Sequence, residues 1–276
     1  MKHQTYYRLL TIAGSDSGGG AGIQADLKTF AALGCYGMSV ITALTAQNTV
    51  AVTGIYEVPA DFVAQQIDAV LDDIGVDAIK IGMLQRAEII RAVADRLRTR
   101  NVSHVVVDPV MISKSGAKLL REETIDTLRT VLLPLATIVT PNIPEASLLA
   151  GQQIKNRSAM EDAGAKILAF GPKAVLVKGG HHRDSLCADC LCTKGKSEEI
   201  EVHWFESKRV KTKNTHGTGC TLSSAIAAYL AKGFKIQEAV KKSKQFIDKA
   251  IKAGSHYSLG KGHGPVHHFH AMWEKE

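Results

Sequence analysis

Short apolar runs recur along the chain and predict a series of β-strands. Most of these runs are continuous, which is typical of strands that are buried on both faces of a sheet. The last two are joined by a charged loop, residues 194–198, which indicates a hairpin. The strands are predicted over residues 9–13, 37–46, 52–58, 78–81, 104–107, 137–139, 174–177, 185–192 and 200–205.

Between these runs, apolar residues return every three or four positions and predict amphipathic helices. Residues 60–74 carry the clearest stripe. Ser158 stands three residues before Glu161, which is the spacing of a capping box and predicts a helix start there. The helices are predicted over residues 21–33, 60–74, 87–98, 123–132, 158–170, 218–231 and 236–253.

The regular alternation of strand and helix predicts an α/β fold, a three-layer α/β/α sandwich with a mostly parallel central sheet. No linker, low-complexity stretch or internal repeat divides residues 1–276, so we expect a single domain. Ligands of such sheets bind beyond the carboxyl ends of the strands. The residues that follow the predicted strands form a polar rim there: 14–16, 47–48, 82–83, 108–109, 141–145 and 178–180.

Residues 211–221, with the sequence KTKNTHGTGCT, carry the most specific chemistry of the chain. Two lysines and a glycine-rich turn come directly before an apolar helical run. A helix that starts there aims unpaired backbone N–H groups and the positive end of its dipole at one point. Such a turn suits a phosphate, and especially a phosphoryl group in transfer. Taken alone, the segment fits an ordinary helix-starting turn equally well.

A second glycine-rich loop, residues 14–22, follows the first strand and opens a helix. Gly20, Gly22 and Ala25 fit the spacing of a dinucleotide fingerprint, but the acidic residue expected about 20 positions later is absent. No Gly-Lys-Ser/Thr sequence ends the loop, which excludes a Walker A motif. The glycines therefore favour close approach of the backbone to a small flat ligand, with the carboxylate of Asp26 one helical turn away.

The bulk composition excludes several classes of protein. The net charge is +7, but aromatic content is only 5% and the lysines are dispersed, so we expect no nucleic-acid partner. No apolar run is long enough for a membrane span, and the start lacks a signal-peptide core, so we expect a cytoplasmic protein without a membrane partner. Five cysteines do not form a disulfide framework. A zinc site at Cys187, Cys190 and Cys192, with His181 and His182 upstream, is a minor alternative.

Ten short motifs in order give the sequence a family resemblance. It resembles the hydroxymethylpyrimidine/phosphomethylpyrimidine kinases of thiamine biosynthesis, which are ribokinase-like kinases, over nearly the whole chain. The motifs are AGSD (13–16), GGAGIQADLKT (19–29), TALTAQNT (42–49), KIGML (80–84), DPVM (108–111), KSG (114–116), TPNIPEA (140–146), VKGGH (177–181), NTHGTGCT (214–221) and GPVHHFH (264–270).

The resemblance implies an ATP- and Mg²⁺-dependent kinase with a ribokinase-like fold. Its substrate would be 4-amino-5-hydroxymethyl-2-methylpyrimidine, whose monophosphate would then be phosphorylated to the diphosphate. The resemblance places the pyrimidine contacts at Gly14, Asp26, Gln47 and Met83. An aminopyrimidine fits these groups, because Gln47 both donates and accepts, Asp26 accepts from an amine and Met83 is a soft apolar contact. Without the resemblance, Gln47 would be interpreted as a strand-end residue and Met83 as core.

The same resemblance assigns the phosphate end of the site. Asp108 and Glu145 follow separate strands and are expected to hold Mg²⁺, directly or through water. Asn142, Lys178 and Thr212 are expected to face the phosphates of ATP. Phosphoryl transfer depends on positioning and charge neutralisation, which fits this donor set. From the sequence alone, Asp108 before a proline is also a common turn residue.

Cys220 occupies the position where sugar-kinase relatives carry an aspartate base. A helix N-terminus can lower the pKa of a thiol. We therefore hypothesise that Cys220 lies beside the attacking hydroxyl as base or proton acceptor. The backbone amides of Gly217, Thr218, Gly219 and Cys220 would hold the transferring group.

Three other functions compete with this interpretation. Pyridoxal kinase, or a kinase of dual specificity, is the nearest, and the amide of Gln47 favours the pyrimidine. A non-catalytic pyrimidine sensor is disfavoured by Asp108, Glu145 and Lys178. A dehydrogenase is disfavoured by the missing ribose-binding carboxylate. The family also implies a homodimer and a structural role for the histidine-rich residues 262–270, with zinc binding there a minor alternative.

Overall fold

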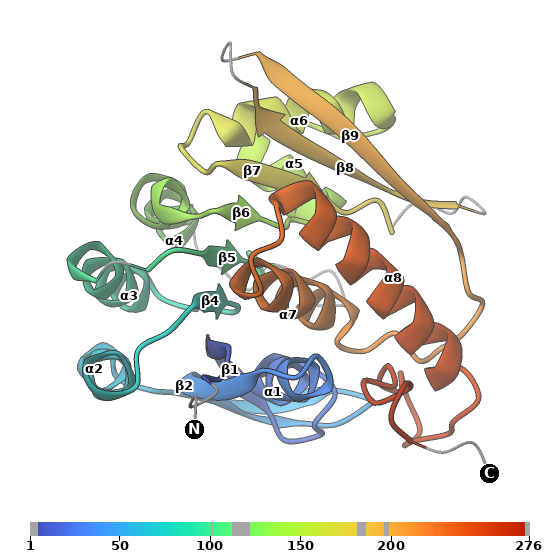
Figure 1. The fold of residues 1–276 in the computed structure, drawn as a ribbon, viewed down its shortest axis with the longest axis horizontal. Coiled ribbons are helices and arrows are strands. Elements are labelled where there is room, and N and C mark those ends of the chain that lie inside the picture. Colours follow the sequence, from blue (N-terminus) through green and yellow to red (C-terminus); the bar gives the residue numbers. More distant parts are fainter. Residues whose placement is uncertain (1–4, 101, 112–121, 181–185, 196–198, 274–276) are drawn as a thin grey trace.

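The computed structural model describes residues 5–100, 102–111, 122–180, 186–195 and 199–273. Its centre is a sheet of nine described strands in the order β3-β2-β1-β4-β5-β6-β7-β8-β9 (Figure 1). The strands β2, β1, β4, β5, β6 and β7 run parallel, while β3, β8 and β9 are antiparallel to their neighbours. The bounds are β1 Arg8–Asp16, β2 Tyr36–Gln47, β3 Val52–Glu57, β4 Ala78–Ile81, β5 Val105–Val107, β6 Ile138–Val139, β7 Ala174–Val177, β8 Leu186–Lys194 and β9 Ile200–Lys208.

Helices cover both faces of the sheet, so the predicted three-layer sandwich is confirmed. One face carries α1 (Gly22–Ala32), α7 (Thr218–Ala231) and α8 (Ile236–Gly254). The other carries α2 (Ala60–Asp73), α3 (Ala87–Thr99), α4 (Glu122–Thr127), α5 (Ile143–Ala150) and α6 (Arg157–Leu168). The helix α4 continues as a π-helical turn, Leu128–Leu132, and a 3₁₀ turn, Leu133–Leu135.

Two apolar cores, one on each face, hold these layers together. Neighbouring residues of a strand point to opposite faces, and both sides are apolar here. In β4, for example, Ile79 and Ile81 pack among α2 and α3, whereas Ala78 packs on the side of α7. The fourth residue of this strand, Lys80, points to the α7 side and is fully buried. The middle of the sheet is therefore covered by an apolar core on each face, and the polar groups lie at the ends of the strands.

Two details of the secondary structure differ from the sequence predictions. The capping box at Ser158 is wrong, because α6 begins one residue earlier and Asn156 is its N-cap, accepting from the backbone of Ala159 at 2.9 Å. A capping box does occur at α5, a helix that the apolar pattern did not reveal, between Asn142 and Glu145. Residues 114–116 of the family motifs, and His181 and His182, lie outside the described residues.

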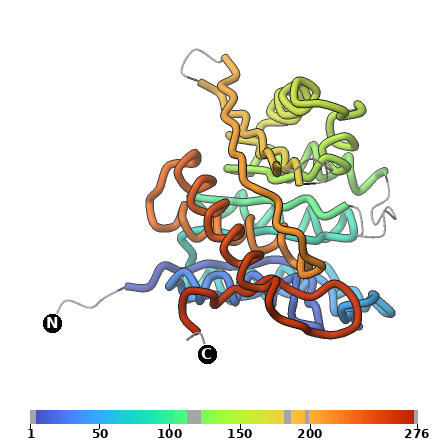
Figure 2. The backbone as a smooth tube through the Cα atoms, turned by 90° about the vertical axis from the view of Figure 1, so that its right-hand side faces the viewer, coloured from blue at the N-terminus to red at the C-terminus, as the bar shows by residue number. Residues whose placement is uncertain are grey.

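The segment after α8 crosses back to the N-terminal half of the chain (Figure 2). The backbone N–H of His263 donates to Thr49 O at 2.9 Å, and that of His216 donates to Gly264 O at 3.0 Å. His268 is buried, and its Nε2 lies 2.9 Å from Thr221 Oγ1 in the first turn of α7. The histidine-rich segment therefore contacts the start of α7 and holds it in place.

Among the described helices, none is long and apolar enough to cross a membrane.

Candidate active site

The two glycine-rich segments meet at the carboxyl edge of the sheet. Gly217 is the N-cap of α7 with φ of 78°, a backbone conformation that favours glycine, and any side chain there would collide with the carbonyl oxygen of Gly20. His216 Nε2 lies 2.8 Å from Asp16 Oδ2. The first loop and the glycine-rich turn before α7 thus form one continuous surface, although Asp16 and His216 are 200 positions apart in the sequence.

Three of the four predicted pyrimidine contacts lie on this surface. A Cβ built on Gly14 would lie 2.8 Å from Met83 Cε, so the thioether end of Met83 sits directly on the Gly14 backbone. Gln47 ends β2, is half-buried, and has its Nε2 3.2 Å from His216 Nε2. Gly14, Met83 and Gln47 therefore border the place where the first loop meets the start of α7.

The fourth residue, Asp26, lies beneath this surface. Its carboxylate is fully buried and accepts hydrogen bonds from Thr11 Oγ1 at 2.6 Å, Ser224 Oγ at 2.7 Å and Lys80 Nζ at 2.8 Å. Burial alone would lower the pKa of Lys80, but Asp26, Cys220 and Asp108 raise it above its ordinary value. The pair holds α1, β4 and α7 together directly under the proposed reaction centre.

Asp108 and Lys178 form a second ion pair, at the end of the site that is predicted to bind phosphate. Lys178 Nζ donates to Asp108 Oδ1 at 2.7 Å, and Thr140 Oγ1 donates to the same oxygen at 3.1 Å. Burial would raise the pKa of Asp108, but Lys178 and Lys80 hold it below its usual range. A Cβ on Gly219 would lie 3.3 Å from Lys178 Nζ and 3.5 Å from Asp108 Oδ2. The pair therefore faces the N–H groups at the start of α7.

Glu145 and Asn142 lie beside this pair at the start of α5. Asn142 Oδ1 accepts from the backbone of Glu145, and the Glu145 carboxylate accepts from the backbone of Asn142 at 2.8 Å. Burial, aided by the negative charge of Asp108, raises the pKa of Glu145 to about 7 against the opposing effect of Lys178. Two buried carboxylates that disfavour each other's charge would be relieved by a divalent cation, so the residues present fit Mg²⁺.

Cys220 lies in the first turn of α7, half-buried. The expectation that the helix N-terminus lowers its pKa is wrong. Burial raises the pKa of the thiol to about 11; Lys80 opposes this effect, while Asp26 and Asp108 add to it. A free-energy cost of removing the thiolate from water outweighs the helix dipole at this position. The thiol is therefore neutral at pH 7.

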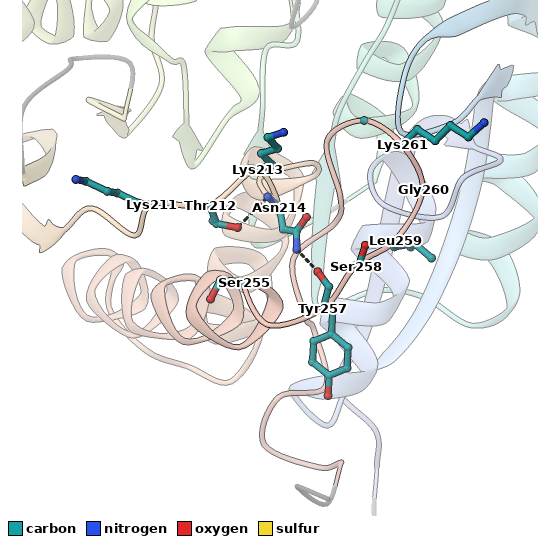
Figure 3. A pocket seen from close by; sticks show the side chains of 11 residues that line it. Lys211, Thr212, Lys213, Asn214, Ser255, Tyr257, Ser258, Leu259, Gly260 and Lys261 are labelled. Carbon is teal, nitrogen blue, oxygen red and sulfur yellow. Dashed lines mark hydrogen bonds between the residues drawn. The ribbon is translucent and has the colours of Figure 1, made fainter.

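Thr212 lies on the segment that leads into the glycine-rich turn before α7 and lines a cavity of about 620 Å³ (Figure 3). The loop after α8 forms the other side of this cavity, including Tyr257 and Leu259. Asn214 joins the two sides by donating to Tyr257 O at 2.7 Å. Lys211 and Lys213 also line this cavity. The cavity has the size of a small-molecule site and polar walls.

Sequence reasoning missed Lys80 and Ser224 as parts of this site, and it placed Asp16 in the polar rim and His216 in the glycine-rich turn without giving either a role. Lys80 had a usable signal, because a lysine inside a four-residue apolar strand must be paired to be buried. The others had no local signal, since their partners come from distant segments. Among the described residues, no group of three or more His, Cys, Asp or Glu side chains is arranged to hold a metal ion.

A mostly parallel sheet with a helix N-terminus, two paired lysines and two buried carboxylates at its carboxyl edge is typical of small-molecule kinases of the ribokinase-like class. Comparison with known proteins agrees. A family profile described as phosphomethylpyrimidine kinase matches residues 16–267. The hydroxymethylpyrimidine/phosphomethylpyrimidine kinase of Salmonella typhimurium is 49% identical over 265 residues, covering 96% of this chain and 98% of that protein. The chain therefore belongs to the phosphomethylpyrimidine kinase family.

Two solved structures are similar along most of the chain. A phosphomethylpyrimidine kinase from Clostridium difficile 630 is 49% identical and has a TM-score of 0.77, covering 88% of this chain and 99% of that one. The pyridoxal kinase of Bacillus subtilis, solved as an ADP complex, is 39% identical with a TM-score of 0.88, covering 98% and 100%. The fold is thus shared by kinases for two different ring substrates.

Proposed function

We propose that this protein transfers a phosphoryl group from ATP to the hydroxymethyl group of 4-amino-5-hydroxymethyl-2-methylpyrimidine in thiamine biosynthesis. It then phosphorylates the monophosphate to the diphosphate. In each step a new P–O bond forms at the acceptor and the bridging P–O bond of ATP breaks, with ADP leaving. In the first step the hydroxyl also gives up its proton.

The contact between the first loop and the start of α7 carries this proposal. Gly217 rests against Gly20, and His216 joins Asp16. A flat ring bordered by Gly14, Gln47 and Met83 would have its hydroxymethyl group within reach of the α7 amides. Those amides stabilise negative charge that develops on a migrating phosphoryl group, because they are fixed before the reaction begins.

The phosphate end supplies positive charge and sites for Mg²⁺ and ATP. Lys178 and the amides of Gly217, Thr218 and Gly219 would bind the γ-phosphoryl, and Asn142 would face the same phosphates. Asp108 and Glu145 would hold Mg²⁺, which neutralises phosphate charge when bound. Thr212 and the cavity beside it would receive the rest of the nucleotide.

ATP consumption with the pyrimidine, followed by the mass of the products, tests this function. We expect a product heavier by one phosphate and then by two. Failure to consume ATP with the pyrimidine, pyridoxal or any other hydroxymethyl heterocycle would instead indicate a binding protein on a kinase scaffold. Binding of NAD but not ATP in a thermal-shift screen would indicate a dehydrogenase.

Pyridoxal phosphorylation is the second candidate, because the TM-score with the Bacillus subtilis pyridoxal kinase, 0.88, exceeds that with the phosphomethylpyrimidine kinase of Clostridium difficile 630, 0.77. Parallel assays with both rings separate the two. We expect a higher kcat/KM for the pyrimidine, since the amide of Gln47 matches an amine next to a ring nitrogen. A preference for pyridoxal would reassign the protein to vitamin B6 salvage.

We also propose that the protein is a homodimer through the β3 edge of the sheet. Five of its six residues are exposed, and they include Val52, Ile55 and Tyr56; Leu44 on β2, which pairs with Tyr56, is 47% exposed. An unprotected apolar edge is rare on a monomer. Light scattering on a sizing column should give twice the mass of one chain. For Ile55→Lys the measured mass should fall to that of one chain.

A further inference from the structure

Asp16 is a buried acceptor that organises the first loop. Its Oδ1 accepts from the backbone of Gly18 at 2.8 Å, and its Oδ2 accepts from Gly20 at 3.0 Å and Ala21 at 2.8 Å. The side chain is 2% exposed. Burial would raise its pKa, but His216 and the loop amides hold it below the usual range, so the group is an anion. An ionised carboxylate can only accept hydrogen bonds.

This fixes the hydrogen on His216. Its Nε2 lies 2.8 Å from Asp16 Oδ2 and must therefore carry a hydrogen, whether the ring is neutral or protonated. The ring has little freedom to turn away, because its Cδ2 lies against Gly20, where any side chain would collide with it. His216 thus presents a fixed N–H next to the substrate surface.

The amide of Gln47 faces this N–H. Its Nε2 lies 3.2 Å from His216 Nε2, and its Oε1 lies 3.2 Å from Thr45 Oγ1, whose hydroxyl donates to Ser15 O at 2.7 Å. When the Gln47 amide nitrogen points towards His216, its N–H meets the N–H of His216. At the other end, Gln47 Oε1 meets the Thr45 oxygen, whose only hydrogen is already donated to Ser15 O. A half-turn of the amide removes both conflicts, because Oε1 then shares the single Nε2 hydrogen of His216 with Asp16 Oδ2, and Nε2 donates to Thr45. The two ends of an amide have nearly the same shape, so their partners decide the orientation.

We propose that His216, held by Asp16, is a positioning residue that sets substrate specificity by fixing the amide orientation of Gln47. This inference rests on the proposed function, in which Gln47 borders the heterocycle. An amide offers one acceptor beside one donor, matching an amine next to a ring nitrogen. A 4-oxo ring, with a carbonyl next to a ring N–H, needs the reverse order. An amide held in one orientation rejects it, whereas an amide free to turn accepts both.

The test compares kcat/KM for the 4-amino ring and its 4-oxo analogue. In the unaltered protein we expect the amino ring to be favoured by at least about 10³-fold, because a mismatch leaves buried polar groups unpaired. His216→Met keeps the length of the side chain but removes the donor. We expect it to reduce the ratio to about tenfold or less, since Gln47 is then free to turn.

A matched variant separates positioning from bulk. His216→Gln places an amide nitrogen as many bonds from the backbone as Nε2 of histidine, with one hydrogen for Asp16 and one for Gln47. It should restore the ratio to within about threefold of the unaltered protein, because it supplies the same donor. A general loss of structure would lower both rates together and leave the ratio unchanged.

Thr45→Val gives an independent reading at the other end of the amide, and should lower the ratio in the same direction by a smaller factor. An unchanged ratio in His216→Met, or no restoration by His216→Gln, would overturn the role of His216. If His216→Met does not fold, an unchanged ratio in Thr45→Val overturns it instead. Absence of any turnover of the amino ring by the unaltered protein would overturn the proposed function itself.

Discussion

Two lysine–aspartate pairs lie at the carboxyl edge of the sheet and differ in access. Lys80 and Asp26 are joined at 2.8 Å with both side chains 0% exposed. Lys178 and Asp108 are joined at 2.7 Å, with Lys178 13% exposed. The chemistry of the two pairs is the same, and their aspartates contact neighbouring serines of α7, Ser224 and Ser223.

The difference lies in how many partners each carboxylate has. Both oxygens of Asp26 are occupied, by Thr11, Ser224 and Lys80. In Asp108 one oxygen is occupied, while Oδ2 has a long contact of 3.4 Å with Ser223 and faces Gly219. Because the Lys80–Asp26 pair is closed to solvent and both carboxylate oxygens already have partners, it can only stabilise the fold. A pair with an unfilled oxygen and an accessible lysine can bind something else.

The largest effect is expected at the sealed pair. Lys80→Met should lower the free energy of unfolding by about 3–5 kcal/mol, because it leaves the Asp26 charge buried and unpaired. Urea denaturation measures this loss. Combining it with Asp26→Asn should recover much of the stability, since the stranded charge is gone. A loss below about 1 kcal/mol would mean that the pair is not a structural one.

The open pair should show the opposite pattern. Lys178→Met should lower kcat by about 10²–10³-fold, because a fixed positive charge next to the phosphoryl group is lost. Its stability loss should be less than half of that at Lys80, since Lys80 still acts on Asp108 and solvent can enter. Steady-state kinetics and urea denaturation on the same samples check both. If Lys80→Met and Lys178→Met changed kcat and the free energy of unfolding equally, the two pairs would not have different roles.

Cys220 lies between the two pairs and tests the hydroxyl end of the reaction. We expect Cys220→Ala to slow the first phosphorylation by about 100-fold, the lower end for a general base. The second step should suffer much less, because its acceptor is already an anion. Since the pKa of the thiol is raised to about 11, the first step should also accelerate with pH between 7 and 9.

Separate assays of the two steps, each over that pH range, measure these effects. In Cys220→Ala the pH dependence should disappear from the first step. Unchanged turnover of the pyrimidine would remove the thiol from the mechanism and leave the α7 amides alone. Cys220→Ser is the matched control, because it keeps the size of the group but not its acidity.

The smallest effect is expected at His268, a third buried contact on α7. Burial lowers its pKa to about 3, below that of an unfolded histidine. The unfolded chain therefore takes up a proton below pH 6.5 that the folded protein refuses. Stability should fall by about 2 kcal/mol between pH 6.5 and 5. His268→Gln keeps a hydrogen bond for Thr221 and should lose less over this range, as thermal melts would show; an identical slope would contradict the assignment.

The sequence predicted the strands and long helices well because their signals are local. The four-residue run at β4 and the apolar helix α7 need no distant partner to be recognised. The helix α5 was missed because it is short and starts at once after β6, with Pro144 in its first turn. The N-cap of α6 was placed at Ser158 because two caps, Asn156 and Ser158, compete within three residues.

The family motifs predicted most residues of the candidate site. They did not predict how these residues lie relative to one another. Met83 contacts Gly14 and Gln47 contacts His216, whereas Asp26 is buried and paired with Lys80; their role in binding a ring stays a prediction. The pKa of Cys220 was misjudged because burial depends on how α1, β4 and α7 pack. Such distances between remote segments are set by the whole fold.

The bracing of the start of α7 by the segment after α8 bears on how the protein is made. The hydrogen bond from Gly262 to Thr49 spans 213 positions of sequence, and Gly264 holds His216. During translation these contacts can form only after residues 262–264 have left the ribosome. We therefore expect the nascent chain to bind ATP poorly until that segment has packed against Thr49 and His216.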